Sequence, residues 1–196
     1  WRFHTEIEPI KGLVVQFHGN AENITSHYQS VVWLLELGYD VIAFDYAGYG
    51  TSQGEAKLKK IMAHAPIVLE YIYETYSSPE ADFWVYGQSL GTLISAYGLS
   101  HIDASIVTGW LVEASLYSLN RSASHLLSKH WVTWLFQPIG FVYVSSRYNM
   151  KKTVPVFSSS MPVMIMHSKH DPVLDVKQSL KLYELLGEQA CLLLID

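Results

Sequence analysis

The sequence predicts an α/β fold built on a doubly wound, mostly parallel β-sheet. Short apolar runs with strand character alternate with longer segments of helical hydrophobic spacing along most of the 196 residues. Apolar strands that alternate with helices are typical of a parallel sheet covered by helices on both faces. The apolar content of 49% is enough for a substantial core in a chain of this length. We therefore expect residues 1–196 to form a single domain.

The predicted strands are short runs of apolar residues, many of them β-branched or aromatic. In chain order they cover residues 13–17, 40–44, 81–86, 105–112, 162–167 and 190–195. Several runs are apolar at successive positions, which is typical of strands buried on both faces.

The predicted helices repeat apolar residues at intervals of three and four positions. In chain order they cover residues 24–37, 58–76, 90–99 and 173–186. Gly38 is expected to end the first helix, and the second is expected to continue despite Pro66. Ligands of such sheets bind beyond the carboxyl ends of the strands, so the loops that follow the strands are candidate sites.

Ser89 lies in a G-x-S-x-G pattern, Gly87-Gln88-Ser89-Leu90-Gly91, between a predicted strand and a predicted helix. Glycines two residues before and after a serine allow a sharp turn and close packing of the following helix. The free N–H groups at that helix start stabilise the negative charge that develops on a substrate carbonyl oxygen. Ser89 is therefore a candidate nucleophile, and the Leu90 N–H is a candidate donor to the oxyanion.

The segment after the first strand, residues 17–23 with the sequence FHGNAEN, is a candidate second half of the oxyanion hole. A loop in this position can direct a backbone N–H toward the nucleophile. Asn20 is the first choice for that donor, and Ala21 is the nearest alternative. In the alternative interpretation, the segment is only a turn into a helix capped by Asn23.

The segment HSKHDPV, residues 167–173, follows a later strand and contains a candidate catalytic acid, Asp171. A carboxylate there fits the chain order serine, acid, histidine, in which the acid orients the histidine. Asp171 could instead start the helix that opens after Pro172, and Glu113, at the end of another strand, is a second candidate acid.

Four motifs, FHGNAENI, FDYAGYGTSQGE, YGQSLGT and HSKHDPV, occur in this order along the chain. In order and spacing they resemble the α/β-hydrolase superfamily, most closely its serine-aminopeptidase-like branch of small serine hydrolases. The resemblance covers nearly the whole chain. It implies Ser89 as nucleophile, Asp171 as acid, and the amides of Leu90 and of Asn20 or Ala21 as the oxyanion hole.

The same resemblance implies a catalytic histidine after the last strand, whereas all nine histidines lie at or before His170. We therefore expect that histidine beyond Asp196, both edges of the fold to be incomplete, and this chain by itself to be nearly inactive. His170 is a weaker alternative base beside Asp171, because a base must reach Ser89 while it also faces the acid. His18 is expected to support the backbone of the oxyanion loop.

Other classes of function find little support. The net charge of −5 and the absence of a basic cluster argue against nucleic-acid binding. The glycines of residues 45–54 do not have dinucleotide-loop spacing, and the next helix begins too late. His167, His170 and Asp171 lack a further ligand at a spacing typical of metal sites, so no metal or other cofactor is expected. Cys191, in an apolar run, is expected to be buried.

Residues 114–160 interrupt the alternation of strands and helices and are expected to form a helical cap inserted over the site. Apolar residues recur there at helical intervals, namely Leu126, Leu127, His130, Trp131, Trp134 and Leu135. Ordinary packing against the core is the alternative for this stripe. No apolar stretch approaches the ~18 residues of a membrane span, and a cytoplasmic location is favoured.

The predicted function is hydrolysis of a carboxylic ester through an acyl-enzyme on Ser89, in the manner of esterases and lipases. A small acyl substrate is the expected partner, and the oligomeric state is not predicted. Thioesters and amides use the same chemistry and remain alternatives. A hydrolase-like protein that binds a ligand or partner without catalysis is the alternative of a different class.

Overall fold

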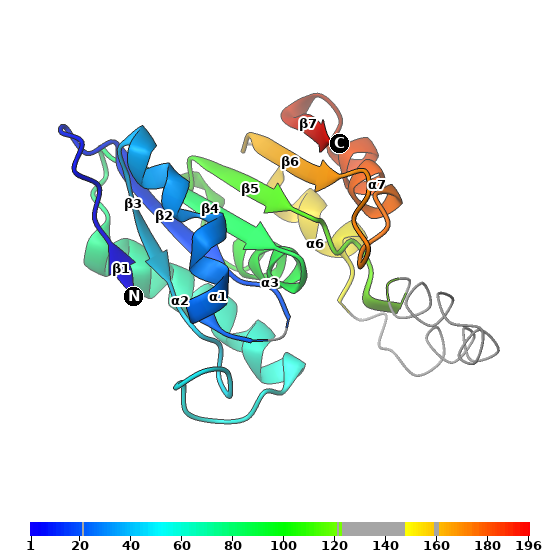
Figure 1. Ribbon diagram of the computed structural model, residues 1–196, viewed down its shortest axis with the longest axis horizontal. Coiled ribbons are helices and arrows are strands. Elements are labelled where there is room, and N and C mark those ends of the chain that lie inside the picture. The colour runs from blue at the N-terminus through cyan, green and yellow to red at the C-terminus, as the bar shows by residue number, and fades with distance from the viewer. Residues whose placement is uncertain (21, 121, 123–147, 159–160) are drawn as a thin grey trace.

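The computed structural model describes residues 1–20, 22–120, 122, 148–158 and 161–196. Its strands form one sheet in the order β1-β3-β2-β4-β5-β6-β7 (Figure 1). β1 is antiparallel to β3, and the other neighbouring pairs are parallel. The strands are β1 Arg2–Phe3, β2 Gly12–Phe17, β3 Tyr39–Ala43, β4 Asp82–Gln88, β5 Gly109–Glu113, β6 Val163–Ser168 and β7 Ala190–Ile195. The predicted α/β fold with a mostly parallel sheet is thereby confirmed.

Helices lie on both faces of this sheet (Figure 1). The α-helices are α1 Ile24–His27, α2 Leu58–Tyr76, α3 Leu90–Leu99, α6 Met150–Phe157 and α7 Lys177–Leu186. The 3-10 helices are η1 Tyr28–Ser30, η2 Val32–Leu37, η3 Ala104–Ile106 and η6 Gly187–Gln189.

The alternating side chains of the strands divide the core into two layers. Leu13, Val15 and Phe17 of β2 pack into the larger layer, which buries side chains of α2, α3, α6 and α7. Val14 points the other way, into a smaller layer with Val31 and residues of η2. Side chains alternate in this way because successive Cβ atoms of a strand point to opposite faces.

The prediction of a single helix over residues 24–37 is wrong, because the segment divides into α1, η1 and η2. The His27 carbonyl accepts hydrogen bonds from Gln16 Nε2 at 2.8 Å and from Ser30 Oγ at 2.9 Å. The Ser30 carbonyl accepts the Trp33 indole N–H at 2.8 Å. Side-chain donors thus bond to carbonyl oxygens within the expected helix, where they compete with the backbone N–H groups of a regular α-helix.

Other boundaries also differ from expectation. α7 begins at Lys177 rather than Val173, with Val176 as its N-cap residue, and Asp175 Oδ1 accepts the Lys177 N–H at 2.9 Å just before it. The sequence did not predict α6, whose Met150 and Phe157 are buried in the larger layer. Cys191 is exposed, against expectation, because alternate side chains of β7 face outward.

Most of the expected cap, residues 114–160, lies outside the described residues, including the apolar stripe at 126–135. Its described flanks are residues 114–120, residue 122 and residues 148–158. Leu116 and the buried side chains of α6 belong to the larger core layer. The cap therefore remains a prediction.

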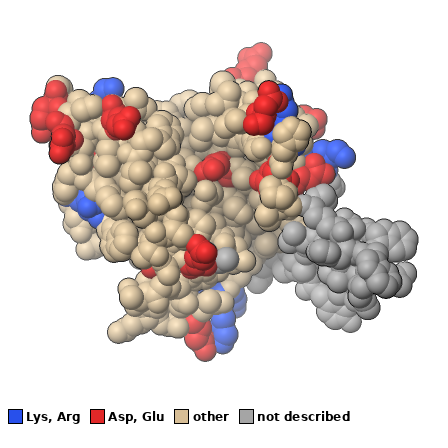
Figure 2. Space-filling view, viewed as in Figure 1, with Lys and Arg blue, Asp and Glu red and all other residues tan. Residues whose placement is uncertain are grey.

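Two properties of the described surface bear on function. No helix within the described ranges is both long enough and apolar enough to cross a membrane. On the face shown in Figure 2, the Lys and Arg side chains that are drawn lie scattered rather than gathered in one basic patch.

A pair of isoleucines tests the core assignment. Ile165 of β6 is 0% exposed, whereas Ile67 of α2 is 61% exposed. Ile165→Ala should lower the free energy of unfolding by about 2–5 kcal/mol, because it leaves a cavity in a packed interior. Ile67→Ala, the matched control, should change it by less than about 0.5 kcal/mol. Urea unfolding measures both, and equal effects would contradict this assignment.

Candidate functional site

Ser89 occupies a sharp turn between β4 and α3. Its backbone dihedrals are φ 52° and ψ −118°, which lie in a region that non-glycine residues rarely adopt. Such strain costs on the order of 1–3 kcal/mol and persists where the surrounding structure holds the residue in place. Here the Ser89 N–H donates to the Glu113 carbonyl at 2.9 Å, and the Ser89 carbonyl accepts the Thr92 N–H at 3.0 Å.

The glycines around Ser89 are required by close contacts. A Cβ on Gly87 would lie 2.6 Å from Ser95 Oγ, and a Cβ on Gly91 would lie 1.9 Å from the carbonyl oxygen of Phe17. Only glycine therefore allows the first turn of α3 to pack against the end of β2. This packing brings the N-terminus of α3 beside the loop that follows β2.

The loop that follows β2 lies next to Ser89. A Cβ built on Gly19 would be 3.4 Å from the Ser89 Cβ. His18 Nδ1 is 2.8 Å from the Gly19 carbonyl oxygen, so this nitrogen carries the proton and donates. In a trans peptide the N–H points opposite to the carbonyl, so this bond also fixes the direction of the Asn20 N–H. Ala21, the other candidate donor, lies outside the described residues.

Tyrosines support this loop from the segment after β3. Tyr46 donates its hydroxyl to the His18 carbonyl at 2.7 Å, and Tyr49 donates to Asn20 Oδ1 at 2.9 Å. The Tyr46 ring also stacks on the His18 ring, with centroids 4.2 Å apart. Burial raises the pKa of Tyr46 well above its usual value, so its hydroxyl stays protonated as a donor.

His18 is a buried, neutral histidine. Its Nε2 has no hydrogen-bond partner and lies 3.6 Å from Asp45 Oδ1. Burial lowers the pKa of His18 from its usual 6.5, and the nearby His27 lowers it further. Bonds and charges that favour protonation, from Gly19 and Asp45, do not outweigh these two effects. The neutral ring therefore holds the oxyanion loop at neutral pH.

Asp171 lies in the loop that follows β6, as expected. Its Oδ1 accepts the N–H groups of Val173 at 2.7 Å and Leu174 at 2.9 Å. Its Oδ2 lies 3.5 Å from Nε2 of the buried His167. The carboxylate is thus held by its own loop and by His167.

Glu113, the second candidate acid, has a different environment. Its carboxylate accepts the hydroxyl of Tyr86 and, at 3.1 Å, the amide of Gln88. Burial raises the pKa of Tyr86, and the Glu113 charge adds to this effect, so Tyr86 remains a donor. Gln88 also bonds His27 Nδ1 at 2.8 Å. Glu113 therefore belongs to a polar network beside the turn that holds Ser89.

One pocket of about 450 Å³ unites the predicted nucleophile, the helix start and the oxyanion loop. Ser89, Leu90 and Asn20 line it together with Val173 and Leu174 from the acid loop. The rest of the lining is mainly apolar and consists of Tyr49, Ala56, Leu58, Ile61, Leu116, Leu119 and Ser122. Asp171 itself does not line the pocket. This arrangement places Ser89 beside an apolar pocket wall.

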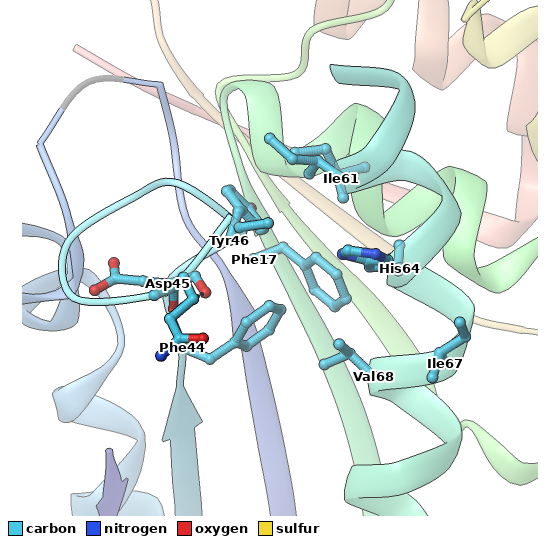
Figure 3. A pocket seen from close by; sticks show the side chains of 13 residues that line it. Phe17, Phe44, Asp45, Tyr46, Ile61, His64, Ile67 and Val68 are labelled. Carbon is cyan, nitrogen blue, oxygen red and sulfur yellow. Dashed lines mark hydrogen bonds between the residues drawn. The ribbon is translucent and has the colours of Figure 1, made fainter. Parts of the chain in front are cut away.

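A second pocket, of about 330 Å³, lies between α2 and the end of β3 (Figure 3). Phe17, Phe44 and Val68 face it, and His64 borders it from α2. Ile61 lines both pockets, whereas Ser89 lines only the first. The candidate nucleophile therefore belongs to the first pocket.

Several residues that shape the site were not singled out from the sequence as functional. Thr92 fixes the Ser89 carbonyl, since its hydroxyl donates to that oxygen at 2.6 Å, and it accepts the Leu116 N–H at 2.9 Å. From the sequence, His167 is considered only as a metal ligand, yet both of its ring nitrogens have close polar neighbours within the protein. Within the described ranges, no cluster of His, Cys, Asp and Glu could hold a metal ion.

Comparisons with known sequences identify the family. A model of the family described as serine aminopeptidase, S33, matches residues 8–160. The uncharacterized protein YfhR of Salmonella typhimurium is 24% identical over 184 residues, which cover 89% of this chain and 59% of that protein. The α/β-hydrolase domain-containing protein aho-3 of Caenorhabditis elegans is 26% identical over 171 residues, covering 85% and 46%. The chain thus spans less than two thirds of the length of these relatives.

Solved structures show the same fold. The esterase Pf2001 of Pyrococcus furiosus superposes with a TM-score of 0.71 at 21% identity, covering 96% of this chain and 73% of that one. Est1E of Butyrivibrio proteoclasticus, solved with ferulic acid bound, superposes with a TM-score of 0.76 at 17% identity, covering 100% of this chain and 84% of that one. An α/β-hydrolase of Vibrio vulnificus gives 0.78 at 15% identity, covering 99% and 72%.

The environment of His18 predicts a pH dependence of stability. Because the folded pKa lies below 6.5, the unfolded chain binds the His18 proton first as the pH falls through that value. The wild type should therefore lose unfolding free energy between about pH 7.5 and about pH 5.5, and His18→Asn should lose less over the same interval. Urea unfolding at both pH values measures the difference.

The control is His64→Asn, which removes an exposed histidine of α2. It shows whether replacing a histidine elsewhere in the fold also reduces the loss of unfolding free energy between the two pH values. An identical pH dependence in the wild type and in His18→Asn would contradict the assignment of a buried neutral His18.

Proposed function

The chain belongs to the serine aminopeptidase S33 family of hydrolases, and from this premise we propose that it hydrolyses carboxylic esters through an acyl-enzyme on Ser89. The observation that carries the proposal is the strained turn of Ser89, φ 52°, at the start of α3 beside the loop after β2. A serine hydroxyl held between two sets of backbone N–H groups suits attack on a carbonyl carbon.

In the proposed reaction, Ser89 Oγ bonds to the substrate carbonyl carbon while a histidine takes the hydroxyl proton. The N–H groups of Leu90 and of Asn20 or Ala21 stabilise the oxyanion of the tetrahedral intermediate. The histidine then protonates the departing alcohol, which leaves an acyl group on Ser89. Water, deprotonated by the same histidine, then attacks the acyl carbon. The histidine returns that proton to Ser89 Oγ as the bond to the serine breaks, which releases the carboxylic acid and free Ser89.

Asp171 is proposed to orient this histidine and to stabilise its protonated form. β7 lies beside the acid loop, because the Lys169 N–H donates to the Ile195 carbonyl at 2.8 Å. We propose that the catalytic histidine lies after this strand, where it would enter the site beside the loop that holds Asp171.

The substrate is proposed to be a small ester with an apolar acyl group. The mainly apolar lining of the pocket beside Ser89 supports this choice. Structural relatives include an esterase of Pyrococcus furiosus and Est1E with bound ferulic acid, which make ester chemistry the first to test. Thioesters and amides could be cleaved by the same groups.

Loss of the nucleophile or the acid should abolish most of the hydrolysis. In the full-length protein, Ser89→Ala should lower kcat for a p-nitrophenyl ester by about 10⁴-fold to 10⁶-fold, and Asp171→Asn by about 10³-fold to 10⁴-fold. Parallel assays with a thioester and an anilide compare the substrate classes.

Ser95→Ala is the matched control, since it removes the hydroxyl of a buried serine in α3 that bonds Trp110 Nε1 at 3.0 Å. Its kcat should remain within about threefold of the wild type. Undiminished hydrolysis by Ser89→Ala would sink the proposed mechanism. A folded wild type that cleaves none of these substrates would instead favour a binding protein.

A further inference from the structure

A group of buried polar side chains near the N-terminus of α7 takes no part in the proposed chemical steps. His167, Gln178 and Ser179 are each at most 5% exposed. Their partners from the segment after β5 are Ser115, Ser118 and Ser122, which are equally buried. Buried polar groups destabilise a fold unless they are hydrogen-bonded, so such a concentration calls for a physical explanation.

The first arm of this group runs from the β5 segment to the acid loop through Ser179. The Ser115 N–H donates to Ser179 Oγ at 3.2 Å. Ser179 can then donate its own hydroxyl proton to His167 Nδ1, which lies 2.6 Å away. This arrangement leaves the proton of the neutral ring on Nε2. That nitrogen lies 3.2 Å from the Leu174 carbonyl and 3.5 Å from Asp171 Oδ2.

The second arm runs through Gln178, the neighbour of Ser179. Gln178 Oε1 accepts the Ser118 N–H at 3.1 Å, and its amide donates to Ser122 Oγ. Ser122 in turn donates its hydroxyl to the Ser118 carbonyl at 3.2 Å. One side-chain amide therefore fixes two points of the β5 segment.

The two segments that these arms join both contribute to the lining of the pocket beside Ser89. Leu116, Leu119 and Ser122 contribute from the β5 segment, and Val173 and Leu174 from the acid loop. Neither segment is a strand at these positions, so no sheet hydrogen bonds hold them together. Their relative position therefore depends strongly on polar contacts through the first turn of α7.

We propose that His167, Gln178 and Ser179 form a polar latch that positions the catalytic acid and the apolar wall of the pocket. The proposal rests on the proposed function, because it takes Asp171 as the acid. Through His167, Ser179 holds Asp171 Oδ2 in the orientation that the catalytic histidine requires. Gln178 holds the wall of Leu119 and Ser122 at the distance that fits the acyl group. All three are positioning residues.

The two arms act on different kinetic constants. Orientation of the acid matters when the catalytic histidine becomes charged in the transition state, so the first arm controls kcat. The pocket wall contacts the substrate in the ground state and the transition state alike, so the second arm controls KM. A nearby carboxylate also raises the pKa of a histidine, so a loosened first arm shifts the pH profile.

The latch is tested by steady-state kinetics of the full-length protein on a p-nitrophenyl ester. Ser179→Ala should lower kcat by about 10-fold to 100-fold, because a small misplacement of a catalytic group has effects of this size. Its KM should stay within about twofold. The acidic limb of its kcat/KM profile should move to lower pH. Gln178→Leu should raise KM by about 10-fold, with kcat within about twofold.

His167→Gln provides a second variant of the first arm if Ser179→Ala does not fold, since glutamine retains a donor and an acceptor. It should lower kcat below that of Ser95→Ala, and it should move the acidic limb of the kcat/KM profile to lower pH. Ser95→Ala is the matched control, because Ser95 and Ser179 are both helical serines with 0% exposure. Thermal unfolding confirms that each variant is folded at the assay temperature.

The outcomes separate the latch from the function itself. A wild type that hydrolyses the ester, with Ser179→Ala and His167→Gln indistinguishable from Ser95→Ala, overturns the latch alone. The latch is also overturned if Ser179→Ala and Gln178→Leu change kcat by the same factor and KM by the same factor. A wild type without Ser89-dependent hydrolysis overturns the proposed function, and the latch with it.

Discussion

The close packing of Gly91 on the end of β2 is the constraint on which the candidate site depends. A Cβ at this position would lie 1.9 Å from the Phe17 carbonyl oxygen and 2.6 Å from that of His18. This approach places the start of α3 against the loop after β2, so the turn that holds Ser89 and that loop form one unit. The strained Ser89 persists within it because its backbone N–H and carbonyl are both bound by neighbouring segments.

Two buried histidines stabilise loops of the candidate site. His18 follows β2 and donates to the Gly19 carbonyl, whereas His167 lies near the end of β6 and contacts the loop around Asp171. Both are almost inaccessible to solvent. A buried imidazole is suited to this task, because it offers one donor and one acceptor without a net charge. The two loops can therefore present polar groups to the pocket, while the histidines that hold them are buried away from water.

The sequence was sufficient for the elements whose pattern is local. α2, α3 and β7 have the predicted bounds, and Ser89, Leu90 and Asn20 line one pocket. The division of residues 24–37 could not be predicted, because it depends on the hydrogen bond from Gln16 of β2 to the His27 carbonyl. The contact of His167 with Ser179 was missed for the same reason, since it links a strand end to a helix start. Hydrophobic periodicity reports burial and carries no information on such tertiary hydrogen bonds.

The central claim is that Ser89 is the nucleophile, and its most direct test is to locate the covalent adduct. The full-length protein would be treated with a fluorophosphonate, digested and analysed by mass spectrometry. A single adduct on the peptide that contains Ser89, lost in Ser89→Ala, is the result that the account predicts. An adduct on another residue, or none on a folded protein that hydrolyses esters, would contradict it.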